Sequence, residues 1–522
     1  MKLNLHNTFT KELPSDSNLN NTRRQVHNAC FSYVTPKKTS NPELLHVSDE
    51  LLNTLSISKE TSQTKEFLDV VTGNKVLKDT HPYAMCYGGH QFGNWAGQLG
   101  DGRAINLTQI RIVDKNWTLQ LKGAGETPYS RTADGLAVLR SSIREYLCSE
   151  AMFHLGVPTT RALSLSLTGD QVMRDMLYDG NPAYEKGAIV CRVSESFIRF
   201  GSFEILSARK DYNTLQALAD YSIKHHYPEI TSSGKDKYIE FFRLVSEKTL
   251  EMIIHWQRVG FVHGVMNTDN MSILGQTIDY GPYGWLEGYD FDWTPNTTDR
   301  QQKRYRFGNQ PNIGLWNLLQ LANALYPLVE EAKPFEDILN QYKIDFDAKH
   351  LEMMKSKIGL FEKDARDTLL IKQLEENLHF TETDMTIFFR KLSEFTSIET
   401  EIKTLPKCLT EAFYKPNEVK ENIKSIWLDW FNTYDQRLLS EKITHQERKR
   451  KMDLINPKYV LRNYMAQLAI DDANKGDYSL IDELYQLLKK PYDEQPNKEK
   501  WFVKRPEWAR HKVGCSMLSC SS

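Results

Sequence analysis

Hydrophobic and polar positions in the first half of the chain alternate between strand-like and helical spacing. Residues 117–121 alternate large and polar side chains, which predicts a strand, and the mostly apolar residues 188–193 predict a second, buried strand. Between them, apolar side chains recur at helical spacing at Leu136, Leu139, Ile143 and Leu147. We expect Asp134 to cap this helix, and Gly156 with Pro158 to close it.

The second half of the chain follows a helical pattern. The apolar spacing turns helical between about residues 215 and 259, and after residue 311 nearly every segment has helical spacing. The charged run at residues 447–451 is typical of a solvated helix face. These patterns predict an α+β fold with a large helical C-terminal region.

The length of 522 residues exceeds one small domain and suffices for two or three packed units. We expect a polar N-terminal arm, a mixed α/β lobe, a second lobe that carries the catalytic segment, and a helical region that ends in a cysteine-containing tail. The boundaries expected for these four parts are residues 1–41, 42–205, 206–310 and 311–522.

Composition narrows the class of protein. Hydrophobic residues make up 40% and charged residues 26%, as in ordinary soluble globular proteins. The formal net charge of −2 gives no electrostatic reason to expect nucleic acid or an anionic membrane as a partner. No apolar run approaches membrane-spanning length, and the seven scattered cysteines form no disulfide framework or zinc pattern. We therefore expect a cytoplasmic protein that binds neither nucleic acid nor membrane.

The segment from residue 263 to residue 280 resembles the catalytic and metal loops of protein kinases. In such loops the histidine is followed by an asparagine and then by an aspartate, and both hold magnesium. Asn270 and Asp279 occupy these positions here. The position two after His263, where kinases keep the catalytic base, is Val265, which cannot accept a proton. Asp269 is the nearest spare carboxylate.

Local chemistry supports this interpretation. Residues 271–274 and 277–279 are short strand-like runs around a glycine turn, so a tight hairpin would bring Asn270 and Asp279 together. Their side-chain oxygens suit Mg²⁺, which takes few protein ligands. The alternative is a hairpin that merely has polar ends.

A lysine at the end of the predicted strand and a glutamate in the next helix form a second pair. Protein kinases hold nucleotide phosphates with such a pair, and Lys122 and Glu145 precede the metal loop in the same order. Asp134 and Gly135 open the helix of Glu145, where backbone N–H groups point outward and suit an anion or polar ligand. A surface ion pair is the alternative.

Glycine-rich turns flank this lysine. In residues 97–103, Gly100 and Gly102 let backbone N–H groups approach phosphate oxygens, and Arg103 adds a charge suited to bidentate phosphate contact. A second turn, residues 123–128, follows directly. Such turns are common and specify little alone.

Two further arginines add to Lys122 and Arg103, the cations that could contact phosphate. Arg192 interrupts the apolar run at residues 188–193, which is costly without an anionic partner, and Arg199 follows soon after. They suggest that the outer phosphates of a nucleoside triphosphate are gripped. The alternative is a structural salt bridge, for which Glu195 and Glu204 are available.

These motifs together resemble the selenoprotein O family (YdiU in bacteria), protein-kinase-like proteins described as adenylyltransferases. The terminal sequence Cys520-Ser-Ser also fits that family. The matching segments are spread over much of the first 310 residues, at positions 87–103, 119–131, 199–204 and 263–281.

The resemblance implies a protein-kinase-like bilobal fold that binds ATP in a flipped orientation. AMP would pass from ATP to Ser, Thr or Tyr hydroxyls of protein substrates, with release of pyrophosphate. The family's magnesium (or manganese) ligands match Asn270 and Asp279, and its proton acceptor matches Asp269. Its nucleotide site falls on Gly100, Gly102, Arg103, Lys122, Asp134, Gly135, Glu145, Arg192, Arg199 and Asp279.

Three rival functions stay open. An ordinary kinase would transfer the γ phosphate, a degenerate kinase fold would only bind nucleotide, and a uridylyltransferase would use UTP with Mn²⁺. The tail adds a hypothesis about regulation, a reversible disulfide between Cys515 and Cys520, against which stands an inert thiol.

Overall fold

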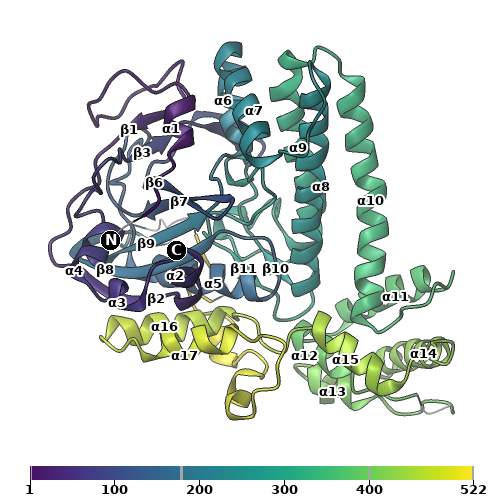
Figure 1. The fold of residues 1–522 in the computed structure, drawn as a ribbon. Helices are drawn as coiled ribbons and strands as arrows, with labels where there is room; N and C mark the ends of the chain where they lie inside the picture. Colours follow the sequence, from purple (N-terminus) through teal and green to yellow (C-terminus); the bar gives the residue numbers. More distant parts are fainter. Residues whose placement is uncertain (2, 177–179, 398–399, 516, 520–522) are drawn as a thin grey trace.

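A seven-stranded antiparallel sheet forms the centre of the N-terminal half, as the computed structural model shows for residues 1, 3–176, 180–397, 400–515 and 517–519 (Figure 1). This mixture of helix and sheet confirms the predicted α+β class. Both predicted strands are central members, paired to each other. In spatial order the strands are β1 (Phe31–Tyr33), β3 (Tyr83–Met85), β6 (Ala104–Ile112), β7 (Lys115–Lys122), β9 (Ala183–Ser194), β8 (Arg161–Arg174) and β2 (Glu43–Val47).

Two small antiparallel sheets and five helices accompany this sheet. Strand β4 (Gly88–Gln91) pairs with β5 (Asn94–Gln98), and β10 (Phe261–Val262) pairs with β11 (Gly284–Trp285). The helices of this part are α1 (Thr8–Glu12), α2 (Asp49–Thr54), α3 (Lys59–Ser62), α4 (Lys65–Val71) and α5 (Leu139–His154), of which α5 packs against β8 and β9.

The start of α5 corrects the expectation for Asp134. The helix begins at Leu139, because the preceding residues are extended and bridge to other segments at Leu136 and Val138. The Asp134 carboxylate instead accepts a hydrogen bond from the Leu136 N–H at 3.0 Å and pairs with Arg174 at 2.7 Å. The predicted end is confirmed, since α5 stops at His154.

Helices make up most of the chain after residue 310, as predicted. Helices α8, α9 and α10 pack side by side, and α16 and α17 return to cover α5 beside the sheet (Figure 1). The helices are α6 (Phe200–Ala208), α7 (Tyr212–His226), α8 (Asp236–Val259), α9 (Gln310–Leu325), α10 (Lys333–Lys357), α11 (Asp367–Phe380), α12 (Met385–Leu392), α13 (Lys407–Ala412), α14 (Glu421–Leu438), α15 (His445–Ile455), α16 (Asn463–Asn474) and α17 (Ser479–Leu488).

Short 3-10 turns connect several of these elements. The turn η1 carries two of the candidate site residues. The turns are η1 (Thr268–Asn270), η2 (Thr297–Asp299), η3 (Phe307–Asn309), η4 (Tyr326–Leu328), η5 (Pro416–Glu418), η6 (Pro496–Trp501) and η7 (Glu507–Ala509).

Helix α8 leads the chain to the candidate site, and its sequence explains its place. Its apolar side chains recur every three or four residues, so one face packs into the core while the opposite face stays polar. Gly260 ends the helix in the left-handed conformation, with φ of 75°, and the chain turns directly into β10.

The charged run at residues 447–451 only partly matches the prediction of a solvated helix face. It lies in α15, and most of its side chains are exposed or half-buried. Arg448 is buried instead, because its guanidinium donates to the Tyr434 hydroxyl at 3.2 Å and to the Phe395 carbonyl oxygen. Charge alone does not reveal which residue of such a run faces the core.

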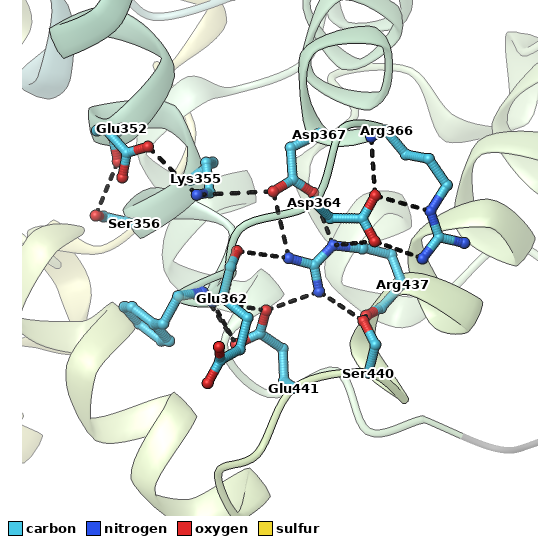
Figure 2. Close-up of polar contacts among 11 residues, drawn as sticks. Glu352, Lys355, Ser356, Glu362, Asp364, Arg366, Asp367, Arg437, Ser440 and Glu441 are labelled. Carbon is cyan, nitrogen blue, oxygen red and sulfur yellow. Dashed lines mark hydrogen bonds and ion pairs between the residues drawn. The ribbon is translucent and has the colours of Figure 1, made fainter.

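A buried ionic network joins three helices of the C-terminal region (Figure 2). Arg437 of α14 donates to both oxygens of Asp367, the first residue of α11, and to Glu441 at 2.7 Å. Lys355 of α10 lies 3.7 Å from the same aspartate. Because Arg437 and Asp367 are both buried, the network ties α10, α11 and α14 together.

We expect Arg437→Ala to lower the free energy of unfolding by about 3–5 kcal/mol, because among the described residues it leaves the buried Asp367 carboxylate with only Lys355 at 3.7 Å. The matched control is Arg366→Ala, which removes the exposed partner of Asp364 in the same region and should cost at most about 1 kcal/mol. Urea unfolding of both variants measures the difference, and equal losses would contradict the role given to Arg437.

Candidate active site

One cavity of about 670 Å³ collects nearly all the residues singled out in the sequence. It lies between the seven-stranded sheet and the loops that follow α8, and its volume is in the usual range for a small-molecule site. Glu145 alone of the predicted set does not line it. The predicted residues on its wall are Gly100, Gly102, Arg103, Lys122, Asp134, Gly135, Arg192, Arg199, Asp269, Asn270 and Asp279.

Lys122 and Glu145 form the predicted ion pair. Lys122 is the last residue of β7, Glu145 lies in α5, and the side chains meet at Nζ and Oε2. Both residues are under 10% exposed, which rules out the surface ion pair. Burial lowers the pKa of Lys122, and the Glu145 carboxylate opposes that effect. The pair therefore presents a fixed ammonium at the cavity wall.

Asp279 lies between two arginines. Its Oδ1 is 2.5 Å from Nη1 of Arg192, and its Oδ2 accepts from Nη1 of Arg199. Burial raises the pKa of this carboxyl, but Arg199, Arg192 and Lys122 outweigh that effect and hold the pKa well below its usual range. Asp279 also has a backbone φ of 57°, a strained conformation of the kind found at functional sites.

The alternative partners proposed for the arginines are wrong. Glu195 pairs with Lys115 at 2.8 Å, and Glu204 pairs with His90 at 2.5 Å. Arg192 instead contacts Glu145 at 3.2 Å as well as Asp279. Its position inside an apolar strand is thus compensated by carboxylates of the cavity.

Asp269 and Asn270 belong to the turn η1. Burial raises the pKa of Asp269 to about 7, against the opposing effect of Arg199. Its Oδ2 is 3.4 Å from Nε2 of Gln91, and its Oδ1 accepts no hydrogen bond from the described residues. The Asn270 amide nitrogen donates to the Val265 carbonyl at 2.9 Å, which leaves its side-chain oxygen as a ligand donor.

The hairpin expected around Gly275 forms only in part. Gly275 takes a φ of 62° in a tight turn, but a single antiparallel bridge joins Met271 to Thr277. The flanking residues pair elsewhere instead, Ser272 with Arg199 and Thr277 also with residue 159. The metal-loop residues still line one cavity, because these outside contacts fix both arms.

The donor set of Asn270 and Asp279 fits a divalent cation of the magnesium type. Both supply hard oxygen donors to the same cavity, and Asp279 stays ionised for the reasons given above. Two protein ligands suit Mg²⁺, which keeps water or phosphate oxygens as its other ligands. The chain therefore has the residues to hold the metal that such a site needs.

At two positions of the cavity wall, neighbouring atoms lie so close to the backbone that only glycine fits. Gly100 has a φ of 78°, and a Cβ there would lie 2.4 Å from the Tyr129 ring. Gly135 has a φ of 69°, and a Cβ would lie 2.1 Å from the Gly125 carbonyl oxygen. Larger residues at either position would displace the wall, so the glycine-rich turns are structurally fixed at this site.

Two contributors to the site were missed by sequence reasoning. Asp101, between the two glycines of the first turn, is buried, and its Oδ2 accepts from the Met85 N–H at 3.0 Å. Its Oδ1 lies 3.9 Å from Nη2 of Arg199. Gln91 approaches the carboxylate of Asp269. A charged residue within a glycine turn was the only available signal for Asp101, and none existed for Gln91.

Of the two tail cysteines, Cys515 lies in the described part of the chain. Cys515 is buried, and burial raises the pKa of its thiol to about 11. Cys520 lies outside the described residues, so the proposed disulfide stays a hypothesis.

Among the helices of the described residues, none combines the length and the apolar character that a membrane span requires.

Comparisons with known proteins agree on one family. A family model described as protein adenylyltransferase SelO matches residues 16–489. Relatives named protein nucleotidyltransferase YdiU are similar over nearly their whole length. The one from Flavobacterium johnsoniae is 62% identical over 100% of this chain and 99% of its own. Those from Rhodopirellula baltica and Aromatoleum aromaticum are 53% and 51% identical, covering 100% and 99% of this chain and 99% of each relative.

Proposed function

The chain belongs to the selenoprotein O family of protein nucleotidyltransferases, and from this premise we propose that it is a protein adenylyltransferase. It transfers AMP from ATP to Ser, Thr or Tyr hydroxyls of protein substrates and releases pyrophosphate, with Mg²⁺ as the metal. The proposal includes a protein-kinase-like bilobal fold, in which the seven-stranded sheet and the helices from α6 onward form the two lobes, and a cytoplasmic setting.

The observation that carries the proposal is the charge distribution of one cavity. Arg103, Lys122, Arg192 and Arg199 all line it, and two of them are buried arginines. Neighbouring carboxylates offset part of this charge. A triphosphate with its Mg²⁺ is a common ligand for such a set of cations, and arginine suits bidentate contact with phosphate oxygens. We assign the arginines to the outer phosphates, so that the α phosphorus faces Asp269.

The chemistry requires a group that receives the proton of the attacking hydroxyl. The hydroxyl oxygen of the acceptor protein bonds to the α phosphorus, the bond from that phosphorus to the α–β bridging oxygen breaks, and pyrophosphate leaves. Asp269 takes the proton, and a pKa near 7 suits a general base at neutral pH. Val265 cannot serve in this role.

The cations stabilise the charge that develops on the leaving group. Arg192 and Arg199, fixed by Glu145 and Asp101, are preorganised for the pyrophosphate oxygens. Lys122 adds a point charge at the end of β7. Mg²⁺, held by Asn270 and Asp279, would offset further phosphate charge.

Isotope labelling separates this proposal from its rivals. With ATP labelled at either the α or the γ phosphate, we expect acceptor protein to retain only the α label, because the β and γ phosphates leave together. Autoradiography after denaturing electrophoresis measures retention. Label retained only from the γ position would identify a kinase instead, and binding without retention of either label would identify a non-catalytic scaffold.

The same assay decides which nucleotide is used. Parallel reactions contain α-labelled ATP or UTP, each with Mg²⁺ or Mn²⁺ alone. We expect AMP incorporation with Mg²⁺ to dominate. Greater incorporation from UTP with Mn²⁺ would replace AMP by UMP in the proposal and leave the assignment as a nucleotidyltransferase intact.

A further inference from the structure

The hairpin of β4 and β5 lies directly on the turn η1, which carries Asp269 and Asn270. The His90 N–H donates to the Thr268 hydroxyl at 2.7 Å, and the Phe92 N–H donates to the Asn267 side-chain oxygen at 3.2 Å. These bonds fix the hairpin beside Asp269, the candidate proton acceptor. The hairpin is therefore placed to form part of the surface that an acceptor protein meets.

Neighbouring residues of β4 line two different cavities. Gln91 lines the active-site cavity and approaches Asp269. His90 lines a second and more open cavity of about 280 Å³, together with Trp95, Glu204 and α9 residues that include Gln320. Successive side chains of a strand point to opposite faces, so one strand separates the two cavities. We call the second cavity the hairpin groove.

Glu204 gives the hairpin groove an unpaired acceptor. The residue is 4% exposed, and its Oε2 lies 2.5 Å from Nδ1 of His90. Its Oε1 is buried and accepts no hydrogen bond from the described residues. A buried carboxylate oxygen without a donor is costly, so this atom favours a ligand that brings a donor.

The rest of the groove favours a cation as that donor. Trp95 is 42% exposed, and its ring lies 5.2 Å from the ring of His90. None of the described residues lining the groove is a lysine or arginine, so Glu204 and its partner His90 supply the ionisable groups of the groove. A carboxylate beside an exposed indole is a suitable environment for an ammonium or guanidinium group.

We propose that the hairpin groove binds a Lys or Arg side chain of the acceptor polypeptide, close in sequence to the hydroxyl that is modified. The inference rests on the proposed function for the identity of the acceptor. It adds a specificity determinant, in which Glu204 selects the charge and Trp95 covers the alkyl chain of the bound residue. His90 holds the carboxylate in place.

Binding of labelled peptides tests the inference without relying on catalysis. Fluorescein-labelled peptides contain one Ser in an alanine-rich background, with a single Lys, Ala or Glu at each flanking position in turn. Fluorescence anisotropy gives Kd for each peptide. The variants are Glu204→Gln, which removes the charge, and Trp95→Ala, at a side chain that is 42% exposed. Glu195→Gln, at a glutamate that pairs with Lys115, is the matched control.

We expect the peptide with Lys at the best position to bind at least tenfold more tightly than its Ala and Glu counterparts. Glu204→Gln should reduce that ratio below twofold, Trp95→Ala should weaken the Lys peptide several-fold, and Glu195→Gln should change neither. Equal binding of all peptides to the unmodified protein would overturn the proposal. A preference that survives in Glu204→Gln, or in Trp95→Ala if the first variant does not fold, would overturn it as well.

The two proposals fail in different ways. If the protein transfers no AMP but still binds the Lys peptide preferentially, the proposed function is wrong and the hairpin groove remains a cation-binding site. Transfer of AMP without any charge preference would leave the proposed function and remove the groove. The transfer assay with α-labelled ATP and the same peptides provides this comparison.

Discussion

Replacing Asp279 by alanine is expected to lower the rate of nucleotidyl transfer by about a thousandfold or more. The substitution removes a proposed metal ligand and the carboxylate that joins Arg192 to Arg199. Both effects act on the same phosphates, because the metal and the two arginines share one cavity. A loss of this size is typical for a group that stabilises charge in the transition state.

The same substitution should also destabilise the fold. Arg192 and Arg199 are both buried, and each loses a carboxylate partner when Asp279 is removed. Breaking a buried ion pair by removing one partner costs about 3–5 kcal/mol. Glu145 and Asp101 remain near the arginines and limit the loss.

Initial rates with α-labelled ATP and thermal unfolding curves measure the two effects of Asp279→Ala. Rates refer to protein shown to be folded at the assay temperature. Asp114→Ala is the matched control, because its side chain is 92% exposed and does not line the cavity. A folded Asp279→Ala variant that keeps more than about a tenth of the activity would show that the site is assigned wrongly.

Replacing Lys122 by methionine is expected to lower kcat/KM for nucleotide by about a hundredfold to a thousandfold. Methionine is also unbranched and only one atom shorter, and it carries no charge. Glu145 retains its contact with Arg192 at 3.2 Å, so the buried glutamate keeps a cationic partner and the fold persists. The effect is therefore expected in catalysis more than in stability.

Lys115→Met is the control for this substitution, since Lys115 lies on the same strand, β7, but is exposed and pairs with Glu195. It should leave kcat/KM within about twofold. The double variant Lys122→Met with Glu145→Gln tests the coupling, because residues in one ionic network give non-additive losses. Additive losses, or an active Lys122→Met enzyme, would remove the pair from the mechanism.

The sequence alone was enough to predict which strand and which helix carry the first charged pair of the candidate site. A lysine at the end of an alternating strand and a glutamate on the next amphipathic helix could be placed in advance, and the buried pair of Lys122 and Glu145 confirms that placement. The order of strand, helix and metal loop supported this placement, because protein kinases carry their lysine and glutamate in the same order. Local periodicity predicted the long helical C-terminal region.

The partners of the buried charges were decided only by the tertiary structure. Arg192 and Arg199 lie 87 and 80 residues from Asp279. Sequence reasoning assigned the arginines to nucleotide phosphates and gave nearby glutamates as the alternative, so it missed this carboxylate partner. Asp134, expected as a helix cap, pairs with Arg174 from β8, and Arg448 of a charged run is buried. Ion pairs between distant segments depend on how the elements pack, and no local pattern of hydrophobic and polar residues contains that information.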